Sequence, residues 1–325
     1  MIIPDIDELT APLLSKYKSA LSGITDSDIA LIGDINRHIG SREGKQLRPT
    51  LMLLTAKCCG FDDDDNPGHP IYKVAAAIET LHNSTLIHDD VVDESSMRRG
   101  AATVNQLWGN KAAVLAGDYY LAQVMYTINS VDDKRITSII NQTAVAMSEG
   151  ELLQLQNCGN YGIDDIVYFD IIKRKTASFM AACCSAGATL TSADPSTIEQ
   201  ARIFGEKLGM AFQVRDDIID FKPSAESGKP TGNDIKERKC TLPLIMTLRN
   251  VDKATGNEIV SMMGSHTLDN KGIEKIIGLV RQHGIPPTQE ILKTLADEAL
   301  EALDGLPANK YRDAMRGIAE KIKKN

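Results

Sequence analysis

The chain lacks an excess of basic residues. Lys and Arg number 36 against 44 Asp and Glu, so the net charge is -8 and the pI is near 5.3. A nucleic-acid partner would require a basic stripe on the surface. The charge balance therefore argues against nucleic acid as a partner.

Cysteines with the spacing of zinc ligands are also missing. The six cysteines stand at positions 58, 59, 158, 183, 184 and 240, and no two of them form a C-x-x-C pair. We interpret them as reduced, buried thiols of a cytoplasmic protein.

Long apolar runs are absent as well. No stretch reaches the ~18 apolar residues that a membrane-spanning helix needs. The first residues, MIIPDIDELTAPLL, carry acidic groups early and have no basic segment followed by an apolar one. We therefore expect neither a signal peptide nor a transmembrane segment, and a cytoplasmic location.

Strand-like alternation is not sustained anywhere, whereas helical periodicity runs through the whole chain. With 42% hydrophobic and 25% charged residues, the composition is ordinary for a globular protein. We predict an all-α fold with one domain over residues 1–325. The expected helices are Ile6–Leu21, Asp26–Ile39, Leu47–Cys59, Ile71–Asp93, Lys111–Asn129, Asp132–Gln156, Ile163–Thr191, Ser196–Phe221, Leu242–Asn250, Gly256–Met263, Leu268–His283, Thr288–Leu303 and Lys310–Lys324.

Two aspartate motifs with identical spacing dominate what is present. Each reads Asp-Asp-x-x-Asp in an apolar context, LIHDDVVD and QVRDDIID. Residues i and i+4 of a helix lie on one face about 6 Å apart. The outer carboxylates of each motif can therefore act together. The residues concerned are Asp89, Asp90 and Asp93 in the first motif and Asp216, Asp217 and Asp220 in the second.

Three carboxylates on one helical turn repel one another unless cations or water lie between them. Magnesium is the ion that suits these carboxylates, because it prefers oxygen ligands, takes one or two carboxylates per ion and completes its shell with water and substrate phosphate. A solvated helix end remains the alternative for either motif alone. The repeated spacing favours the metal, so all six aspartates are predicted metal ligands.

Basic residues beside small or turn-forming ones supply the groups for phosphate. Together with the two aspartate motifs they indicate two anionic diphosphates, one bridged by metal and one held by cations alone. These residues stand in the segments GKQLRP (44–49), RRG (98–100), KT (175–176), GKP (228–230) and KCTLP (239–243).

In these segments the chain resembles the trans-isoprenyl diphosphate synthases, the polyprenyl synthetase family. One departure is Arg238, where the family usually has glycine. The matching segments, in family order over about two hundred residues, are GKQLRP (44–49), ETLHNSTLIHDDVVD (79–93), RRG (98–100), LAGDYYL (115–121), SEGELLQL (148–155), KT (175–176), FQVRDDIID (212–220), GKPTGND (228–234) and KCTLPL (239–244).

The resemblance implies a single large bundle of antiparallel helices around a central cavity, the isoprenoid synthase type. It implies an enzyme of isoprenoid biosynthesis, a prenyltransferase, that ionises an allylic diphosphate such as farnesyl or geranylgeranyl diphosphate. The cation is attacked by isopentenyl diphosphate, and a proton is then lost. About three magnesium ions are expected with substrate bound.

The resemblance also assigns roles to single residues, each named here by its place in this sequence. Isopentenyl diphosphate is expected on Lys45, Arg48, His82 and Arg99, and the allylic diphosphate on Arg98, Lys175, Lys229 and Lys239. The catalytic set is Asp89, Asp93, Asp216, Lys175, Thr176 and Gln213, with Thr176 and Gln213 facing the carbocation.

Product length is expected to depend on the helix face before the first motif. In the family, bulky residues four or five positions before the first aspartate stop the growing tail early. Here these are Thr85 and Ser84, both small, with Leu81 and Ala77 further up the same face. We therefore expect all-trans products longer than geranylgeranyl, with a short-chain farnesyl or geranylgeranyl synthase as the alternative.

Three other hypotheses compete with that of an active prenyl diphosphate synthase. A non-catalytic subunit of a heteromeric prenyl synthase usually loses the aspartates, and all six are present. A di-iron bundle needs two Glu-x-x-His motifs, and the chain has only Glu79 to His82. A terpene cyclase would replace the second motif. From the family we expect a homodimer whose product passes to membrane enzymes.

Overall fold

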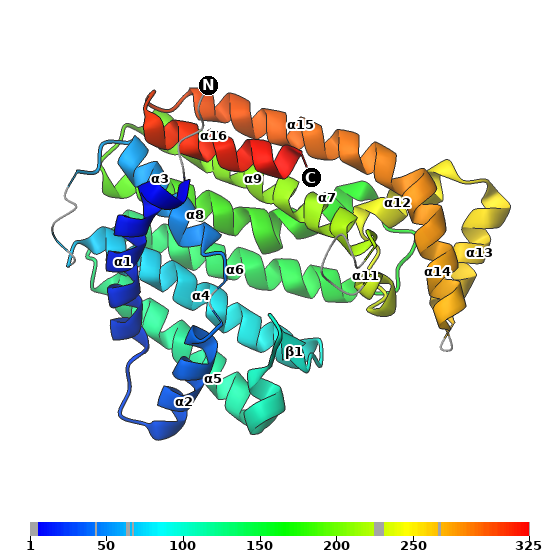
Figure 1. The fold of residues 1–325 in the computed structure, drawn as a ribbon, viewed down its shortest axis with the longest axis horizontal. Helices are drawn as coiled ribbons and strands as arrows, with labels where there is room; N and C mark the ends of the chain where they lie inside the picture. The colour runs from blue at the N-terminus through cyan, green and yellow to red at the C-terminus, as the bar shows by residue number, and fades with distance from the viewer. Residues whose placement is uncertain are drawn as a thin grey trace. The chain divides into compact units, whose positions relative to one another are not determined.

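The described part of the chain is helical apart from one small hairpin. The computed structural model describes residues 6–42, 44–62, 66, 68–223, 231–265 and 268–324, with 1–5, 43, 63–65, 67, 224–230, 266–267 and 325 outside it. The hairpin pairs β1 (Met97–Arg98) with β2 (Ala101–Ala102). The predicted all-α class is confirmed (Figure 1). None of the described helices is long and apolar enough to cross a membrane.

The chain forms two compact units, which we describe separately; the prediction of one domain stays a prediction. The first unit comprises residues 1–144, 182–202 and 305–315. It holds α1 (Ile6–Thr25), α2 (Ala30–Gly40), α3 (Leu47–Cys58), α4 (Pro70–Val92), the hairpin, α5 (Val104–Asn129) and parts of α6 (Lys134–Gln156), α8 (Ser178–Leu190), α9 (Pro195–Asp220) and α16 (Lys310–Lys323).

Helix α4 is the buried centre of the first unit and packs against α1, α3 and α5 (Figure 1). Its contact with α5 is close because Gly117 has no side chain. A Cβ there would collide with the His88 ring, and Ser84 Oγ donates a 2.8 Å hydrogen bond to the Gly117 carbonyl. This packing fixes the end of α4 that carries the first aspartate motif.

The hairpin after α4 turns at Arg99 and Gly100, whose φ angles are +51° and +75°. Two left-handed residues at a two-residue turn match the twist of a β-hairpin. The hairpin is tied to α2, because His38 Nε2 lies 2.8 Å from the Ala102 carbonyl oxygen. That oxygen only accepts, so His38 Nε2 carries the hydrogen. The hairpin also contacts α4, because Arg98 Nε donates to Asp90 Oδ1.

The second unit comprises residues 145–181, 203–304 and 316–325. In it, α7 (Asp165–Ile172) continues through a π-helix, η1 (Lys173–Ala177), into α8. Single π-turns inside α-helices are rare and often lie at functional sites. The unit also holds α11 (Asn233–Lys236), α12 (Leu242–Asn250), α13 (Lys253–Gly264), α14 (Asn270–Leu279), η2 (Val280–Gly284) and α15 (Ile285–Asp304).

Four local predictions were wrong. The loop expected at 284–287, around Gly284, is helical because η2 joins α14 to α15, and the π-turn accommodates two prolines that lack N–H donors. Helix α5 begins at Val104, with a non-helical kink at Gly109. The short helix α11 was missed. Cys158 is exposed rather than buried, although all six cysteines are unpaired as expected.

Candidate active site

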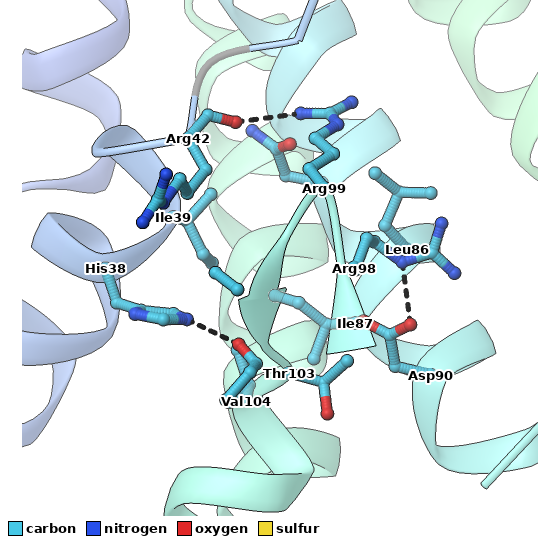
Figure 2. Close-up of a pocket in the computed structure, with 13 residues that line it drawn as sticks. His38, Ile39, Arg42, Leu86, Ile87, Asp90, Arg98, Arg99, Thr103 and Val104 are labelled. Atoms are coloured by element: carbon cyan, nitrogen blue, oxygen red, sulfur yellow. Dashed lines mark hydrogen bonds and ion pairs between the residues drawn. The ribbon is translucent and has the colours of Figure 1, made fainter. Parts of the chain in front are cut away.

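The first aspartate motif occupies the C-terminal end of α4, in the first unit. Asp89 is half-buried and Asp93 exposed, so both carboxylates reach solvent. Asp90 is only 4% exposed and accepts a 2.7 Å hydrogen bond from Arg98 Nε. Burial raises the pKa of Asp90, and the Arg98 guanidinium opposes that shift. Arg98 is thus shared between the hairpin and the middle carboxylate (Figure 2).

The cations predicted for isopentenyl diphosphate gather in the same unit. Arg48 Nη1 lies 3.1 Å from His82 Nε2. Because Arg48 can only donate, His82 must accept, which requires an unprotonated Nε2. Burial, with Arg48, Arg99 and Arg98 nearby, holds the pKa of His82 well below its usual value. His82 is therefore a neutral ring that offers a donor through Nδ1, not a cation.

The Arg99 side chain explains why position 44, just before the exposed Lys45, is a glycine. A Cβ at Gly44 would lie 2.5 Å from Nη2 of Arg99. Arg99 passes over the glycine backbone, and its Nη1 donates to the Arg42 carbonyl at 3.2 Å. Any side chain at position 44 would displace the Arg99 guanidinium. The close approach accounts for this part of the motif.

A small pocket, open to solvent, lies between α2, α4 and the hairpin (Figure 2). Apolar side chains such as Ile39, Leu86 and Ile87 form its walls, and Arg42 and Arg99 stand at it. Asp90 and Arg98 belong to the lining as well, so this pocket adjoins the first motif.

The second motif ends helix α9, in the second unit, and its inner carboxylate is committed to protein contacts. Asp217 is 5% exposed; Tyr168 Oη donates to its Oδ2 at 2.6 Å and Gln213 Nε2 to its Oδ1 at 2.9 Å. Burial raises the pKa of Asp217 to about 7, against the effect of these two donors. Asp216 is half-buried.

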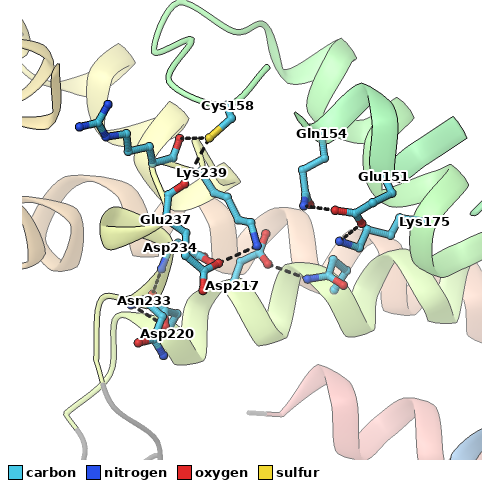
Figure 3. A network of polar contacts seen from close by, with 12 residues as sticks. Glu151, Gln154, Cys158, Lys175, Asp217, Asp220, Asn233, Asp234, Glu237 and Lys239 are labelled. Atoms are coloured by element: carbon cyan, nitrogen blue, oxygen red, sulfur yellow. Dashed lines mark hydrogen bonds and ion pairs between the residues drawn. The ribbon is translucent and has the colours of Figure 1, made fainter. Parts of the chain in front are cut away.

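Asp220, the last residue of the motif, caps helix α11. Its two carboxylate oxygens accept 3.1 Å hydrogen bonds from the backbone N–H groups of Asn233 and Asp234 (Figure 3). Burial raises the pKa of Asp220, and these N–H groups oppose the shift. Burial and the nearby carboxylates of Asp217 and Asp220 raise the pKa of Asp234 well above its usual value. The second motif is therefore a concentrated, partly buried acidic cluster.

The lysines predicted for the allylic diphosphate pair with acids here. Lys175 Nζ forms an ion pair with Glu151, and Lys239 Nζ lies 2.6 Å from Glu237 Oε2 (Figure 3). A diphosphate would have to compete with these carboxylates. Lys229 lies outside the described residues.

Thr176 and Gln213, the two residues that the resemblance assigns to the carbocation, are in contact with each other. Thr176 Oγ1 donates to Gln213 Oε1 at 2.9 Å, and Thr176 sits in the π-helix η1, 8% exposed. Gly209, one turn before Gln213, lies against Ala177, where a Cβ would meet the Ala177 Cα at 2.6 Å. Close packing of η1 on α9 therefore brings the two side chains together.

The residues predicted to set product length divide between two sides of α4. Ser84 is buried and bonded to α5, and Ala77, seven residues before it, is buried on the same side. Leu81, three residues before Ser84 and four before Thr85, is buried between the two sides. Thr85 is half-buried, and its Oγ1 donates to the His82 carbonyl at 2.9 Å. Thr85 lies nearer the side of Asp89 than Ser84 does.

Sequence reasoning missed Tyr168, His38 and the capping role of Asp220. Tyr168 stands in the apolar run IVYFDII and looks like plain core. A signal existed for the cap, since Gly-Asn-Asp after a loop is typical of a helix start.

Magnesium fits the accessible carboxylates. Within the ranges that the structure describes, no three His, Cys, Asp or Glu side chains gather closely enough to hold a metal by themselves. Asp89 and Asp93, one turn apart at a solvent-reached helix end, suit an ion that takes one or two carboxylates and fills its shell with water and phosphate.

Comparison with known proteins extends over nearly the whole chain. The family model described as polyprenyl synthetase matches residues 29–280. The octaprenyl diphosphate synthase of Escherichia coli (strain K12) is 32% identical over 98% of both chains. The all-trans-nonaprenyl-diphosphate synthase (geranyl-diphosphate specific) of Rhodobacter capsulatus is 33% identical over 97% of this chain and 96% of its own.

Among solved structures, the polyprenyl synthase of Caulobacter crescentus CB15, complexed with calcium and isoprenyl diphosphate, superposes with a TM-score of 0.92. It is 30% identical and covers 98% of this chain and 97% of that chain. An all-α fold of this kind with two aspartate motifs is that of an isoprenoid synthase. The chain belongs to the polyprenyl synthetase family, and the prediction of a prenyltransferase is confirmed.

Proposed function

We propose that this chain condenses isopentenyl diphosphate with an allylic diphosphate to make an all-trans polyprenyl diphosphate longer than geranylgeranyl. The carrying observation is the first motif, where two solvent-reached carboxylates stand beside Arg98, Arg99, and the Arg48–His82 pair. Relatives named octaprenyl and nonaprenyl diphosphate synthases support the long product.

We assign the basic residues to two groups, one for each diphosphate substrate. We assign isopentenyl diphosphate to Lys45, Arg48, His82 and Arg99, where guanidinium groups and a neutral imidazole donor can bind phosphate oxygens without metal. The allylic diphosphate is assigned to Arg98, Lys175 and Lys239, with Lys229 from outside the described residues. Glu151 and Glu237 hold the two lysines in place until a diphosphate replaces them.

Magnesium is the proposed cofactor, and a relative's crystals hold calcium with isoprenyl diphosphate. When bound, the ion neutralises the charge that develops on the leaving diphosphate. Asp89 and Asp93 would hold magnesium in the first unit and Asp216 in the second, with about three ions proposed when substrate is bound. Asp90, Asp217 and Asp220 orient neighbouring groups through the hydrogen bonds described above.

A homodimer is part of the proposal, supported by α5. Beyond its kink, this helix exposes Val114, Leu115, Met125 and Tyr126, with exposures between 40% and 75%. Positions 114 and 125, like 115 and 126, are three turns apart and share a face. A second copy of the chain would cover this apolar face.

A cytoplasmic location is proposed from the six unpaired cysteines, which suit a reducing compartment. The product joins a long apolar tail to a diphosphate, so we propose that enzymes of a membrane consume it.

The deciding experiment incubates the purified chain with Mg²⁺, isopentenyl diphosphate and farnesyl diphosphate, followed by mass analysis of products. A ladder ending beyond geranylgeranyl supports the proposal. Product that stops at geranylgeranyl or before it supports the short-chain alternative. No product with farnesyl, geranyl or geranylgeranyl primer would favour a non-catalytic subunit instead.

A further inference from the structure

Four polar side chains of the second unit, three of them buried and Gln213 half-buried, form one continuous hydrogen-bond network. Tyr168 on α7 donates to Asp217 Oδ2 at 2.6 Å, and Gln213 Nε2 donates to Asp217 Oδ1 at 2.9 Å. Gln213 Oε1 accepts from Thr176 Oγ1 at 2.9 Å. Tyr168, Asp217 and Thr176 are 3%, 5% and 8% exposed. Water therefore has little access to these three side chains, whereas Gln213 between them is half-buried.

The direction of every hydrogen bond follows from Asp217. In the structure both oxygens of Asp217 accept, one from Tyr168 and one from the Gln213 NH₂, which is the arrangement of an ionised carboxylate. This leaves the Gln213 carbonyl oxygen facing Thr176. A carbonyl oxygen only accepts, so the Thr176 hydroxyl must donate its single hydrogen. The lone pairs of Thr176 Oγ1 are left to face away from Gln213.

We propose that Tyr168 is a positioning residue for prenyl transfer: through Asp217 and Gln213 it fixes the Thr176 hydroxyl with its oxygen lone pairs available to the allylic carbocation. The inference rests on the proposed function, in which Thr176 and Gln213 face that cation. Tyr168 occupies the second oxygen of Asp217 and stops the carboxylate from rotating out of line with Gln213. Tyr168 itself touches no substrate.

The orientation matters because a hydroxyl has a partly negative oxygen, which attracts a cation, and a partly positive hydrogen, which repels it. With its hydrogen held by Gln213, Thr176 offers a negative end, which stabilises positive charge in a site with little water. If the amide rotated by half a turn, its NH₂ would donate to Thr176. The Thr176 hydrogen would then be free to point at the cation and destabilise it.

The carbocation has two fates that an assay can separate. Its precursor's C–O bond breaks, and the electron pair leaves with the diphosphate. In condensation, the double bond of isopentenyl diphosphate supplies the electrons for a new C–C bond, and the released diphosphate takes up the proton that is lost. In capture by water, a water oxygen supplies the electrons and also loses a proton, leaving an allylic alcohol. A poorly oriented cation site favours the second fate.

The test is Tyr168→Phe, which removes one oxygen atom. With farnesyl diphosphate, isopentenyl diphosphate and Mg²⁺ in H₂¹⁸O, we expect kcat to fall about ten- to a hundredfold, as when an outer-shell partner of a functional group is removed. KM for both substrates stays within about twofold of wild type. The share of ¹⁸O-labelled farnesol rises several-fold. The label separates capture of the cation at carbon from hydrolysis at phosphorus.

Tyr161→Phe is the matched control. Tyr161 is a tyrosine of the same unit. Its hydroxyl donates to the Met263 carbonyl at 3.0 Å and is not part of the hydrogen-bond network that joins Tyr168 to Thr176. It should keep the wild-type kcat and farnesol share. If Tyr168→Phe also kept both, or lost activity with no rise in labelled farnesol, the positioning role would be overturned.

A double-mutant cycle checks the route through Thr176. Thr176→Val removes the hydroxyl, so the further change Tyr168→Phe should then have little added effect on the farnesol share. Effects that multiply independently would contradict the proposal. If Tyr168→Phe does not fold, Asp217→Asn replaces it, because an amide can donate or accept and no longer fixes Gln213. A wild-type farnesol share in Asp217→Asn would likewise overturn the inference.

These outcomes are distinct from failure of the proposed function. If the wild-type chain makes no polyprenyl diphosphate, the function itself is wrong. If the wild type condenses its substrates and Tyr168→Phe behaves like Tyr161→Phe, only the inference about Tyr168 fails.

Discussion

The two aspartate motifs share one spacing but hold their middle carboxylates in different ways. Asp90 is paired with a cation, the Arg98 guanidinium, whereas Asp217 is held by the neutral donors Tyr168 and Gln213. Burial raises the pKa of both. An arginine partner leaves an ionised Asp90 compensated, while Asp217 has only dipoles to support its charge.

The last aspartates differ as well. Asp93 is exposed at the end of α4, whereas Asp220 caps α11 with both of its oxygens. The first motif therefore presents two outer carboxylates to solvent, and the second uses its acids to organise the loop that follows. Identical letters at identical spacing do not specify identical roles, because neighbours decide which carboxylates are accessible.

The largest expected effect tests what the motifs have in common. Asp89→Ala and Asp216→Ala should each lower kcat by about a thousandfold or more, since each removes a carboxylate assigned to the metal. Steady-state kinetics over a range of Mg²⁺ concentrations would measure this, with circular dichroism to confirm the helices. Asp297→Ala, which only breaks an exposed ion pair with Lys323, is the control. Near-normal turnover in the double variant would refute the metal assignment.

The pH dependence of stability should separate the motifs. The pKa of Asp217 rises from 3.8 to about 7 on folding, so its contribution to the stability of the metal-free protein is full below about pH 4 and is lost as the pH rises through about 7. The loss is of the order of a few kcal/mol. Asp220 and Asp234 shift in the same direction.

Urea unfolding between pH 4 and 8 in the presence of a chelator measures this effect. Asp217→Asn should flatten the curve, whereas Asp90→Asn should flatten it less, because the Arg98 guanidinium opposes the upward pKa shift of Asp90. Equal flattening by both variants would remove the distinction between the motifs.

The helix before the first motif offers a smaller effect. Thr85→Phe should shorten the product, because Thr85 is half-buried and lies nearer the side of Asp89. Ser84→Phe should instead destabilise the fold by about 1–3 kcal/mol, since it must enter the close contact with Gly117 of α5. Product mass and thermal unfolding distinguish the two. A stable Ser84→Phe variant with short products would show that Ser84 faces the growing tail.

The smallest effect concerns the chain after the second motif. Arg238 adopts φ of +56°, the left-handed region that favours glycine, which agrees with the glycine usual in the family. Arg238→Gly should raise the free energy of unfolding by about 0.5–1 kcal/mol. Ser192→Gly, at φ +57°, should do the same in the first unit. Unfolding curves that move in the opposite direction would contradict this reading.

The fold class and most helices could be predicted, because helical periodicity is written in the local sequence. The hydrogen bond between Thr176 and Gln213 could not, because the resemblance named both residues without saying that they touch. The π-helices could not, since an i to i+5 bond depends on what packs against the helix, here α9 against η1 at Gly209. The role of Tyr168 could not be predicted either. It stands within an apolar run, and only the folded structure shows that its hydroxyl donates to Asp217.

The π-helix η1 determines which kinds of mutation this region tolerates. A π-turn accommodates one residue more than the α-helix would, so the residues on its two sides are offset by about 100° from an uninterrupted helix. Removing one residue between Lys173 and Ala177 would leave two good helices and an intact core composition, yet swing Tyr168 away from Asp217. Along this helix, natural sequence change by substitution is therefore tolerated far more readily than change in length.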